Sequence, residues 1–225
     1  MPETTCNLDS CFLCKNCIPE WKEIIAMKKK TLFFKKGTVI FSEGSPVEGI
    51  FFLIEGAVKV YKQWAEQREL IVRFAKAGDV LGHRGLGGDN LYPISATSLE
   101  DTRACYIPND FLEATLLTNP AFTYRLMHLY ANELQKAEKR MRDMALMEVK
   151  GRIALALLEI ADLFGTDDEK YIAIPITRQD IASYAGTTYE TVFKFFTELV
   201  IQNILSTIGK RIKINKVDAL QKFIG

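Results

Sequence analysis

The sequence has no uninterrupted apolar run of roughly 18 residues or more, the length that marks a membrane-spanning helix. Its first 17 residues are polar and lack the apolar stretch of a secretory signal. We therefore expect no membrane partner and a cytoplasmic location. An excess of one charge is also missing, because 29 lysines and arginines stand against 28 aspartates and glutamates. A nucleic-acid partner would need a local basic face, which the overall charge does not reveal.

Histidine is scarce, since the 225 residues include only His83 and His128. Two isolated histidines give no pattern for a catalytic triad or a histidine-rich metal site. A lone histidine is more often structural than catalytic, so we expect a protein that is not an enzyme.

Cysteine occurs five times, and four of the five crowd into residues 6–17. Thiols stay reduced in the cytoplasm, which favours metal binding or redox chemistry over structural disulfides. The candidate metal ligands are Cys6, Cys11, Cys14, Cys17 and Cys105.

Short runs rich in Val, Ile, Phe and Tyr alternate with glycine between Thr31 and Pro108, a stretch that holds nine of the 14 glycines. Many short strands separated by turn signals predict a small antiparallel barrel or roll. The predicted strands are Thr38–Phe41, Ile50–Ile54, Ala57–Tyr61, Leu70–Ala75 and Thr102–Ile107.

A helical pattern follows the roll. A short helix is predicted over Phe111–Leu117, and Asn119-Pro120 opens a segment that reaches Met147 without glycine or proline. Apolar residues in this segment follow the 3-4 spacing of a coiled-coil seam, and charged residues cover its other faces. The seam consists of Met127, Tyr130, Leu134, Ala137, Met141 and Met144. A stripe this narrow favours dimerisation over a core helix packed against its own roll.

The last part of the chain contains a helix-turn-helix pattern over residues 177–195. A helix at Val149–Phe164, ended by Gly165, and a short strand at Tyr171–Pro175 are predicted to precede it. Ala182 stands where the two helices of the motif cross, and Gly186 stands where the turn needs a positive φ. Val192 and Phe195 are the expected apolar anchors of the second helix.

The second helix is predicted to present its N-terminal face to DNA bases. A basic hairpin follows, formed by Ile204–Thr207 and Lys210–Ile214, and it has the character of a wing. The predicted DNA-binding residues are Arg178, Gln179, Thr187, Thr188, Tyr189, Glu190, Phe193, Lys194, Lys210 and Arg211. The alternative is a ligand-binding or scaffold module without DNA binding, in which the outward Phe193 serves a protein–protein face.

The order of these parts resembles the Crp/Fnr family of transcription regulators over residues 30–225. In the roll the likeness rests on Gly37, Gly56, Gly78-Asp79-Val80, Gly82 and 99–103 followed by Ile107-Pro108; in the last part it rests on Thr177-Arg178, Asp180-Ile181, Gly186 and 190–192. The resemblance implies an α+β fold: a jelly-roll-like antiparallel β-roll, a long dimerisation helix and a winged helix-turn-helix. It implies a homodimer that binds double-stranded DNA, works with RNA polymerase and responds to a redox signal or a small effector.

The corresponding division of the chain has four parts. Residues 1–20 are a cysteine-rich arm, 21–118 the sensory roll, 119–147 the dimerisation helix and 148–225 the DNA-binding domain. An effector is expected to act by shifting the hinge around Met144–Arg152 between two dimer arrangements.

Cyclic AMP is not the expected effector. Relatives that bind it carry Gly-Glu and, about ten residues later, Arg-Ser/Thr-Ala, whereas this chain has Gly82-His83 and Ile94-Ser95-Ala96. Burying a phosphate beside Ile94 without a cation is costly. The pocket for some other effector is predicted at Gly82, His83, Arg84, Gly85, Leu86, Ser95 and Ala96.

The cysteines resemble those of the Fnr-type oxygen sensors, which hold an iron–sulfur cluster on three N-terminal cysteines and a fourth in the roll. Cys105 occupies the place of that fourth ligand, but the arm reads C-x4-C-x2-C-x2-C, which is tighter than the Fnr pattern. Three hypotheses therefore stay open: an iron–sulfur cluster, a zinc ion, or a mobile arm with thiols that bind nothing.

Overall fold

The computed structural model describes residues 11–64 and 68–224. Cys6 lies outside these described residues. The chain divides into two compact units, which we call the N-terminal unit (Met1–Lys62 with Ala75–Gln135) and the C-terminal unit (Gln63–Phe74 with Lys136–Gly225). The four-part division expected from the sequence stays a prediction. No helix within 11–64 and 68–224 combines the length and the apolar character needed to cross a bilayer.

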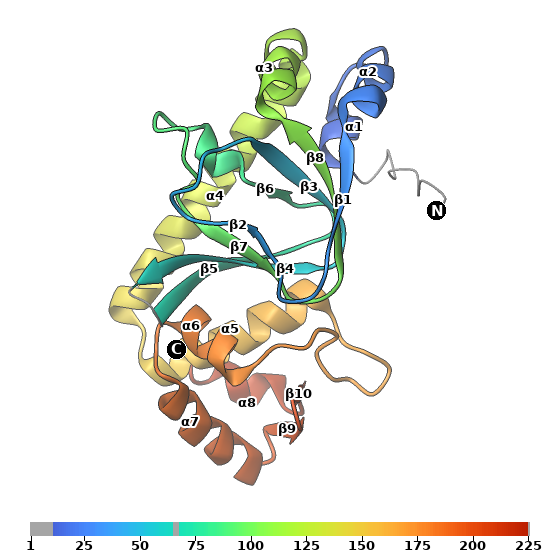
Figure 1. Cartoon of the computed structure of the whole chain (residues 1–225). Helices are drawn as coiled ribbons and strands as arrows, with labels where there is room; N and C mark the ends of the chain where they lie inside the picture. The colour runs from blue at the N-terminus through green and yellow to red at the C-terminus, as the bar shows by residue number, and fades with distance from the viewer. Residues whose placement is uncertain (1–10, 65–67, 225) are drawn as a thin grey trace. The chain divides into compact units, whose positions relative to one another are not determined.

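Two four-stranded sheets form the roll, in the orders β1-β8-β3-β6 and β2-β7-β4-β5 (Figure 1). The pairs β1–β8, β3–β8, β3–β6, β2–β7 and β4–β7 are antiparallel. The strands are β1 (Lys30–Phe34), β2 (Val39–Phe41), β3 (Gly49–Glu55), β4 (Ala57–Trp64), β5 (Arg68–Lys76), β6 (Val80–Leu81), β7 (Ser95–Ser98) and β8 (Thr102–Pro108). The predicted antiparallel roll is confirmed.

The central pair of the roll is β3 with β8, where Phe52 lies opposite Cys105. Alternate residues of both strands point into one core, so Ile50, Phe52, Cys105 and Ile107 are almost fully buried. The chain reverses between β3 and β4 at Gly56, whose φ is +96°. A Cβ there would lie 2.4 Å from Thr102 Oγ1, so only glycine fits this turn.

Strands β1, β6 and β7 were not predicted from the sequence, and one predicted strand is wrong. Residues 171–175 form no strand; they contribute only an isolated bridge between Thr166 and Ile172. The physical reason is local, because Asp167 Oδ1 accepts a hydrogen bond from the backbone N–H of Tyr171, 2.9 Å away, and closes a loop. This satisfies a donor that a strand would have used.

The described part of the cysteine arm, from residue 11 onward, packs on the roll. It forms the short helix α1 (Phe12–Asn16), followed by α2 (Trp21–Lys28). Leu13 and Cys14 are almost completely buried. Ring stacking of Trp21 on Phe111, with centroids 5.9 Å apart, joins α2 to α3 (Asn109–Thr118). Burial of Cys11, Cys14 and Cys17 in the N-terminal unit disfavours the hypothesis of a mobile arm for this part of the chain.

The long helix α4 (Pro120–Leu146) begins where the sequence predicted, and it has two different faces. Phe122 and Leu126 are buried in the core of the N-terminal unit. Met127, Leu134 and Met141 of the predicted seam are 59–66% exposed in the single chain. Exposed apolar residues at this spacing are what a second helix would cover.

The C-terminal unit contains the predicted helix-turn-helix and wing (Figure 1). Its elements after α4 are α5 (Val149–Phe164), α6 (Arg178–Ala185), α7 (Tyr189–Ile201), β9 (Leu205–Ile208), β10 (Arg211–Ile214) and α8 (Val217–Gln221). A reciprocal capping box between Thr177 and Asp180 starts α6. Gly165, at φ +72°, follows the last residue of α5, as predicted.

Arg152 of α5 joins three parts of the C-terminal unit. Its guanidinium donates to the backbone oxygens of Met144 and Met147, at 3.1 and 3.0 Å, and to that of Ala185, at 3.0 Å. These oxygens lie near the C-terminal ends of α4 and α6, where carbonyls are left unpaired and the helix dipole is negative. One cation thus satisfies acceptors from two helix ends.

We expect Arg152→Met to lower the free energy of unfolding by about 2–4 kcal/mol, because several charge-assisted hydrogen bonds are lost at a half-buried position. Urea denaturation followed by circular dichroism measures this difference. Lys139→Met, an equivalent change at an exposed position of α4, is expected to change the value by less than about 0.5 kcal/mol. Equal stability of the two variants would contradict the role given to Arg152.

Candidate nucleic-acid interface

The turn between α6 and α7 has the geometry that the sequence predicted. Gly186 adopts φ +63°, and a Cβ at this position would lie 2.8 Å from Met144 Sδ. Ala182 and Val192 are fully buried and Phe195 nearly so, which holds α7 against the rest of the unit. Thr188 is the N-cap of α7, where its side chain accepts from the Thr191 N–H.

The N-terminal face of α7 is exposed to solvent. Two rows of side chains, each spaced by four residues, run along it: Tyr189 with Phe193, and Glu190 with Lys194. The predicted residues Thr188, Tyr189, Glu190, Phe193 and Lys194 are all exposed. The first turn of a helix with such a free polar and aromatic face fits the major groove.

The other predicted contacts come from α6 and the wing. Gln179 is exposed, whereas Arg178 and Thr187 are half-buried. The Arg178 guanidinium lies over the Phe196 ring, 5.4 Å from its centroid. Lys210 lies in the turn between β9 and β10 and is exposed. It is a cation at the tip of the wing.

Arg211 has a different environment from Lys210. Its guanidinium is 2.7 Å from a carboxylate oxygen of both Asp167 and Glu169, and it stacks on Tyr171. The hydrogen bond from Arg211 lowers the pKa of Asp167 below its ordinary value. Two carboxylates beside Arg211 neutralise its charge, so it offers less to a phosphate than Lys210 does.

The predicted effector residues lie in and beside a short 3₁₀ helix, His83–Leu86, in the N-terminal unit. His83 Nε2 lies 3.1 Å from Glu133 Oε2, and Arg84 Nε donates to the same oxygen at 3.0 Å. Tyr130 donates to the His83 backbone oxygen. Glu133 thus joins the 3₁₀ helix to α4. It was not among the effector residues predicted from the sequence.

The remaining effector residues surround this helix. Gly82 precedes it with φ +82°, Gly85 is buried within it, and Leu86 at its end is exposed. Ser95 and Ala96 are buried on β7, where Ser95 Oγ accepts from the Glu43 N–H at 2.8 Å. Arg84 is therefore directed to Glu133, and Ser95 to the backbone.

Four buried cysteines share the hydrophobic cluster of the N-terminal unit. Cys11, Cys14 and Cys17 of the arm belong to the same cluster as Cys105 of β8. Burial, with the nearby Cys11 as a second cause, raises the pKa of Cys17 to about 12. Within the described ranges, no three His, Cys, Asp or Glu side chains form a group that would hold a metal ion. The described residues thus give the zinc hypothesis no support.

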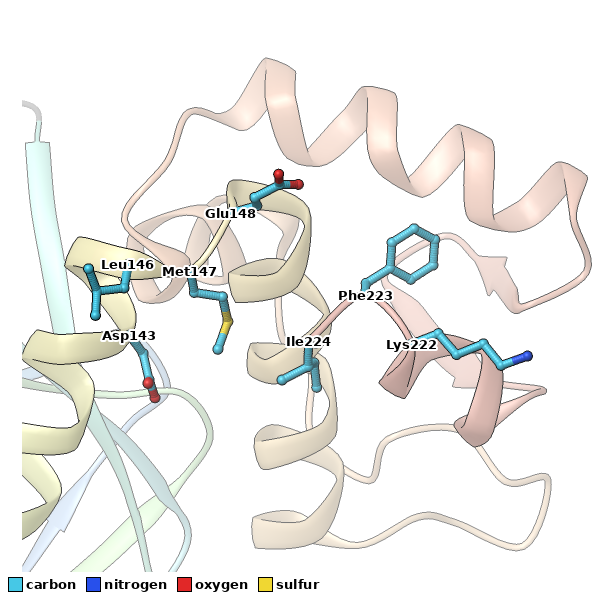
Figure 2. Close-up of a pocket in the computed structure, with 7 residues that line it drawn as sticks. All are labelled: Asp143, Leu146, Met147, Glu148, Lys222, Phe223 and Ile224. Carbon is cyan, nitrogen blue, oxygen red and sulfur yellow. The ribbon is translucent and has the colours of Figure 1, made fainter.

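A separate hollow lies in the C-terminal unit where α4 passes into α5 (Figure 2). Its volume is about 410 Å³. The residues that line it are Asp143, Leu146, Met147, Glu148, Lys222, Phe223 and Ile224. None of them belongs to the predicted DNA-binding or effector residues, so this hollow is distinct from both sites.

Two family descriptions match the chain. Residues 31–119 match the cyclic nucleotide-binding domain, and residues 151–223 match the Crp-like helix-turn-helix domain. The matched ranges contain the roll and the helix-turn-helix with its wing. The first match identifies the domain family and does not show that this domain binds a cyclic nucleotide. The chain has His83 and Ile94 where relatives that bind cyclic AMP have glutamate and arginine.

Similar proteins include a cAMP-activated regulator and an anaerobic regulator. The CRP-like cAMP-activated global transcriptional regulator of Mycobacterium tuberculosis is 25% identical over 181 residues, which cover 80% of this chain and 81% of that protein. The anaerobic regulatory protein of Bacillus subtilis is 27% identical over 166 residues, covering 72% and 70%. The structure of FixK2 from Bradyrhizobium japonicum has a TM-score of 0.76 at 27% identity and covers 88% of this chain and 98% of that one.

The fold, the helix-turn-helix geometry and these similarities agree with one another. The relatives are transcription regulators, a family that is not enzymatic. Because both family descriptions match and the fold agrees with them, the chain belongs to the Crp/Fnr family of DNA-binding transcription regulators.

Proposed function

We propose that the chain works in the cytoplasm as a homodimer that binds a near-palindromic DNA site through two copies of α7. The observation that carries this proposal is the exposed N-terminal face of α7, with Lys210 on the neighbouring wing. Two recognition helices related by a two-fold axis would contact half-sites about one helical turn apart. The bound dimer would then act on transcription through RNA polymerase.

The polar and charged residues among the predicted contacts have distinct chemical roles in this proposal. Glu190 accepts a hydrogen bond from the amino group of a cytosine, and Lys194 donates to a guanine or a phosphate. Gln179 and Lys210 bind the phosphate backbone, which fixes the register of the protein on the duplex. Arg178 and Arg211 are less available to phosphate than Lys210. Arg178 is half-buried over Phe196, and Arg211 is paired with two carboxylates.

The proposed dimer contact is the seam of α4. Met127, Leu134 and Met141 supply most of its exposed apolar surface, and Ala137 lies between them. Tyr130 and Met144 of the predicted seam are half-buried in the single chain. The seam is therefore narrower than the sequence indicated, although its spacing still fits two helices.

We also propose that the signal is sensed by an iron–sulfur cluster on Cys11, Cys14, Cys17 and Cys105. Four buried thiols belong to one hydrophobic core, and four cysteine thiolates are the ligands that an iron–sulfur cluster uses. These ligands need not lie as close together as the ligands of a single metal ion, because an iron–sulfur cluster contains several atoms and holds its ligands further apart. When bound, the cluster would supply redox chemistry, while the protein's part is to hold the thiolates and exclude water.

An effector site at His83 and Arg84 is the second candidate for sensing. It is favoured by the bonds of both residues to Glu133, because a ligand there would act on α4 directly. An anion would compete with the Glu133 carboxylate for Arg84.

The phosphate role of Lys210 predicts a change in salt dependence. Lys210→Ala should weaken binding to all duplexes alike and reduce the slope of log affinity against log salt by about 1 per DNA-binding domain. Fluorescence anisotropy at several salt concentrations measures this slope. Lys222→Ala, which removes an exposed lysine of the same unit outside the predicted interface, should leave the slope unchanged. An unchanged slope for Lys210→Ala would contradict the wing contact.

The seam predicts that Leu134→Glu yields monomers, because it puts two like charges into the middle of an apolar contact. Sedimentation velocity measures the mass of the particle. Affinity for the near-palindromic DNA site should fall as the dimer is lost. Asn132→Glu, on an outer face of α4, introduces the same charge and should stay dimeric. A dimeric Leu134→Glu variant would show that the contact lies elsewhere.

The cluster proposal predicts iron and sulfide in protein reconstituted under anaerobic conditions. Cys105→Ser should lose most of the iron, whereas Cys6→Ser should retain it. Thermal unfolding of the apo forms shows whether Cys105→Ser remains folded, so a loss of iron is not mistaken for a loss of structure. Wild-type protein that stays free of iron after reconstitution would contradict the cluster and leave the effector site as the sensor.

A further inference from the structure

An aromatic row on α7 is not used by the contacts proposed so far. Tyr189 and Phe193 lie one turn apart, with ring centroids 6.3 Å apart and planes inclined by 24°. They remain 42% and 51% exposed. Both are in the first two turns of the helix, directly beside Glu190 and Lys194.

The row continues as apolar surface along α7. Behind Phe193 is a hollow of about 200 Å³. The residues that line it are Arg178, Phe193, Phe196, Thr197, Val200, Ile201 and Thr207. Phe193 therefore lies beside the Tyr189 ring and also lines this hollow.

Exposed aromatic rings usually mark a contact surface, since they leave apolar area in water. The charged row beside them identifies the partner. Glu190 and Lys194 flank the rings on the same helix face, and both are suited to base edges and phosphates. A protein partner would have to pair these charges as well, whereas DNA accommodates the charges and the rings together.

We propose that Phe193, supported by Tyr189, binds the C5-methyl groups of thymines in the half-site. The thymine methyl is the apolar feature that bases present in the major groove, and phenylalanine is among the side chains that contact it. The inference rests on the proposed function, because it names the base that this part of α7 selects. The half-site would then contain thymine next to the base pair that Glu190 contacts.

The rings also discriminate against other bases. A phenyl ring has no donor or acceptor for the amino group of cytosine or the O6 of guanine. Such a polar edge would lose water without gaining a partner when placed against Phe193. Thymine preference thus has an attractive part, the methyl contact, and a repulsive part, the unpaired polar edges.

The test replaces thymine by deoxyuridine, which lacks only the methyl group and keeps the same pairing. Duplexes selected by the wild-type protein from a randomised pool are resynthesised with deoxyuridine at one thymine position at a time. We expect an affinity loss of about fourfold at each position whose methyl is buried by Phe193.

Phe193→Ala should bind the thymine and deoxyuridine duplexes equally, while it still distinguishes the base pair read by Glu190. Phe193→Leu, which keeps an apolar side chain, should retain part of the difference.

The outcomes separate this inference from the proposed function. Sequence-selective binding with no loss at any deoxyuridine position would overturn thymine reading and leave the proposed function standing. The same holds if Phe193→Ala keeps the full deoxyuridine penalty. If the pool yields no preferred sequence and the rings instead bury against a protein, both proposals fail together.

Discussion

The C-terminal unit depends on one cation that holds several helix ends together. Arg152 donates to backbone oxygens of Met144, Met147 and Ala185, so the end of α4, the start of α5 and the end of α6 meet at one guanidinium. Arginine suits this place because its planar fork of five donors reaches several acceptors at once, which a lysine does not. Gly186 adopts φ +63°, a conformation that residues other than glycine rarely take, and it lies against the end of the Met144 side chain. The turn that orients α7 is thus built against the end of α4.

Much of this architecture was predictable because it follows from local rules. The period of the apolar residues gave α4 and α5, and the Ala182–Gly186–Val192 pattern gave the helix-turn-helix. Strand β7 was missed because Ser95–Ser98 is polar and small, and its strand character comes from pairing with β2 and β4. The contacts of Glu133 with His83 and Arg84 were also beyond prediction. They join residues far apart in sequence, and no local pattern records such a meeting. A lone arginine within the apolar segment Val149–Phe164 was the one available indication of Arg152.

Three chemically different regions emerge from the same chain. The N-terminal unit holds a buried group of thiols and, separately, a histidine and an arginine bonded to one glutamate of α4. Helix α4 carries an exposed apolar seam, and α7 carries an exposed face with one charged and one aromatic row. The two candidate sensors therefore lie in the unit where α4 begins, and the DNA-binding face lies in the unit where it ends. Helix α4 has residues in both units, so the proposed regulation would act through this helix.

Two copies of α7, held by a dimer, are proposed to contact DNA at two places. Hydroxyl-radical footprinting on a selected duplex tests this most directly. Two protected regions related by two-fold symmetry are expected, on one side of the DNA and about one helical turn apart. A single protected region without symmetry, bound by one chain per duplex, would contradict it.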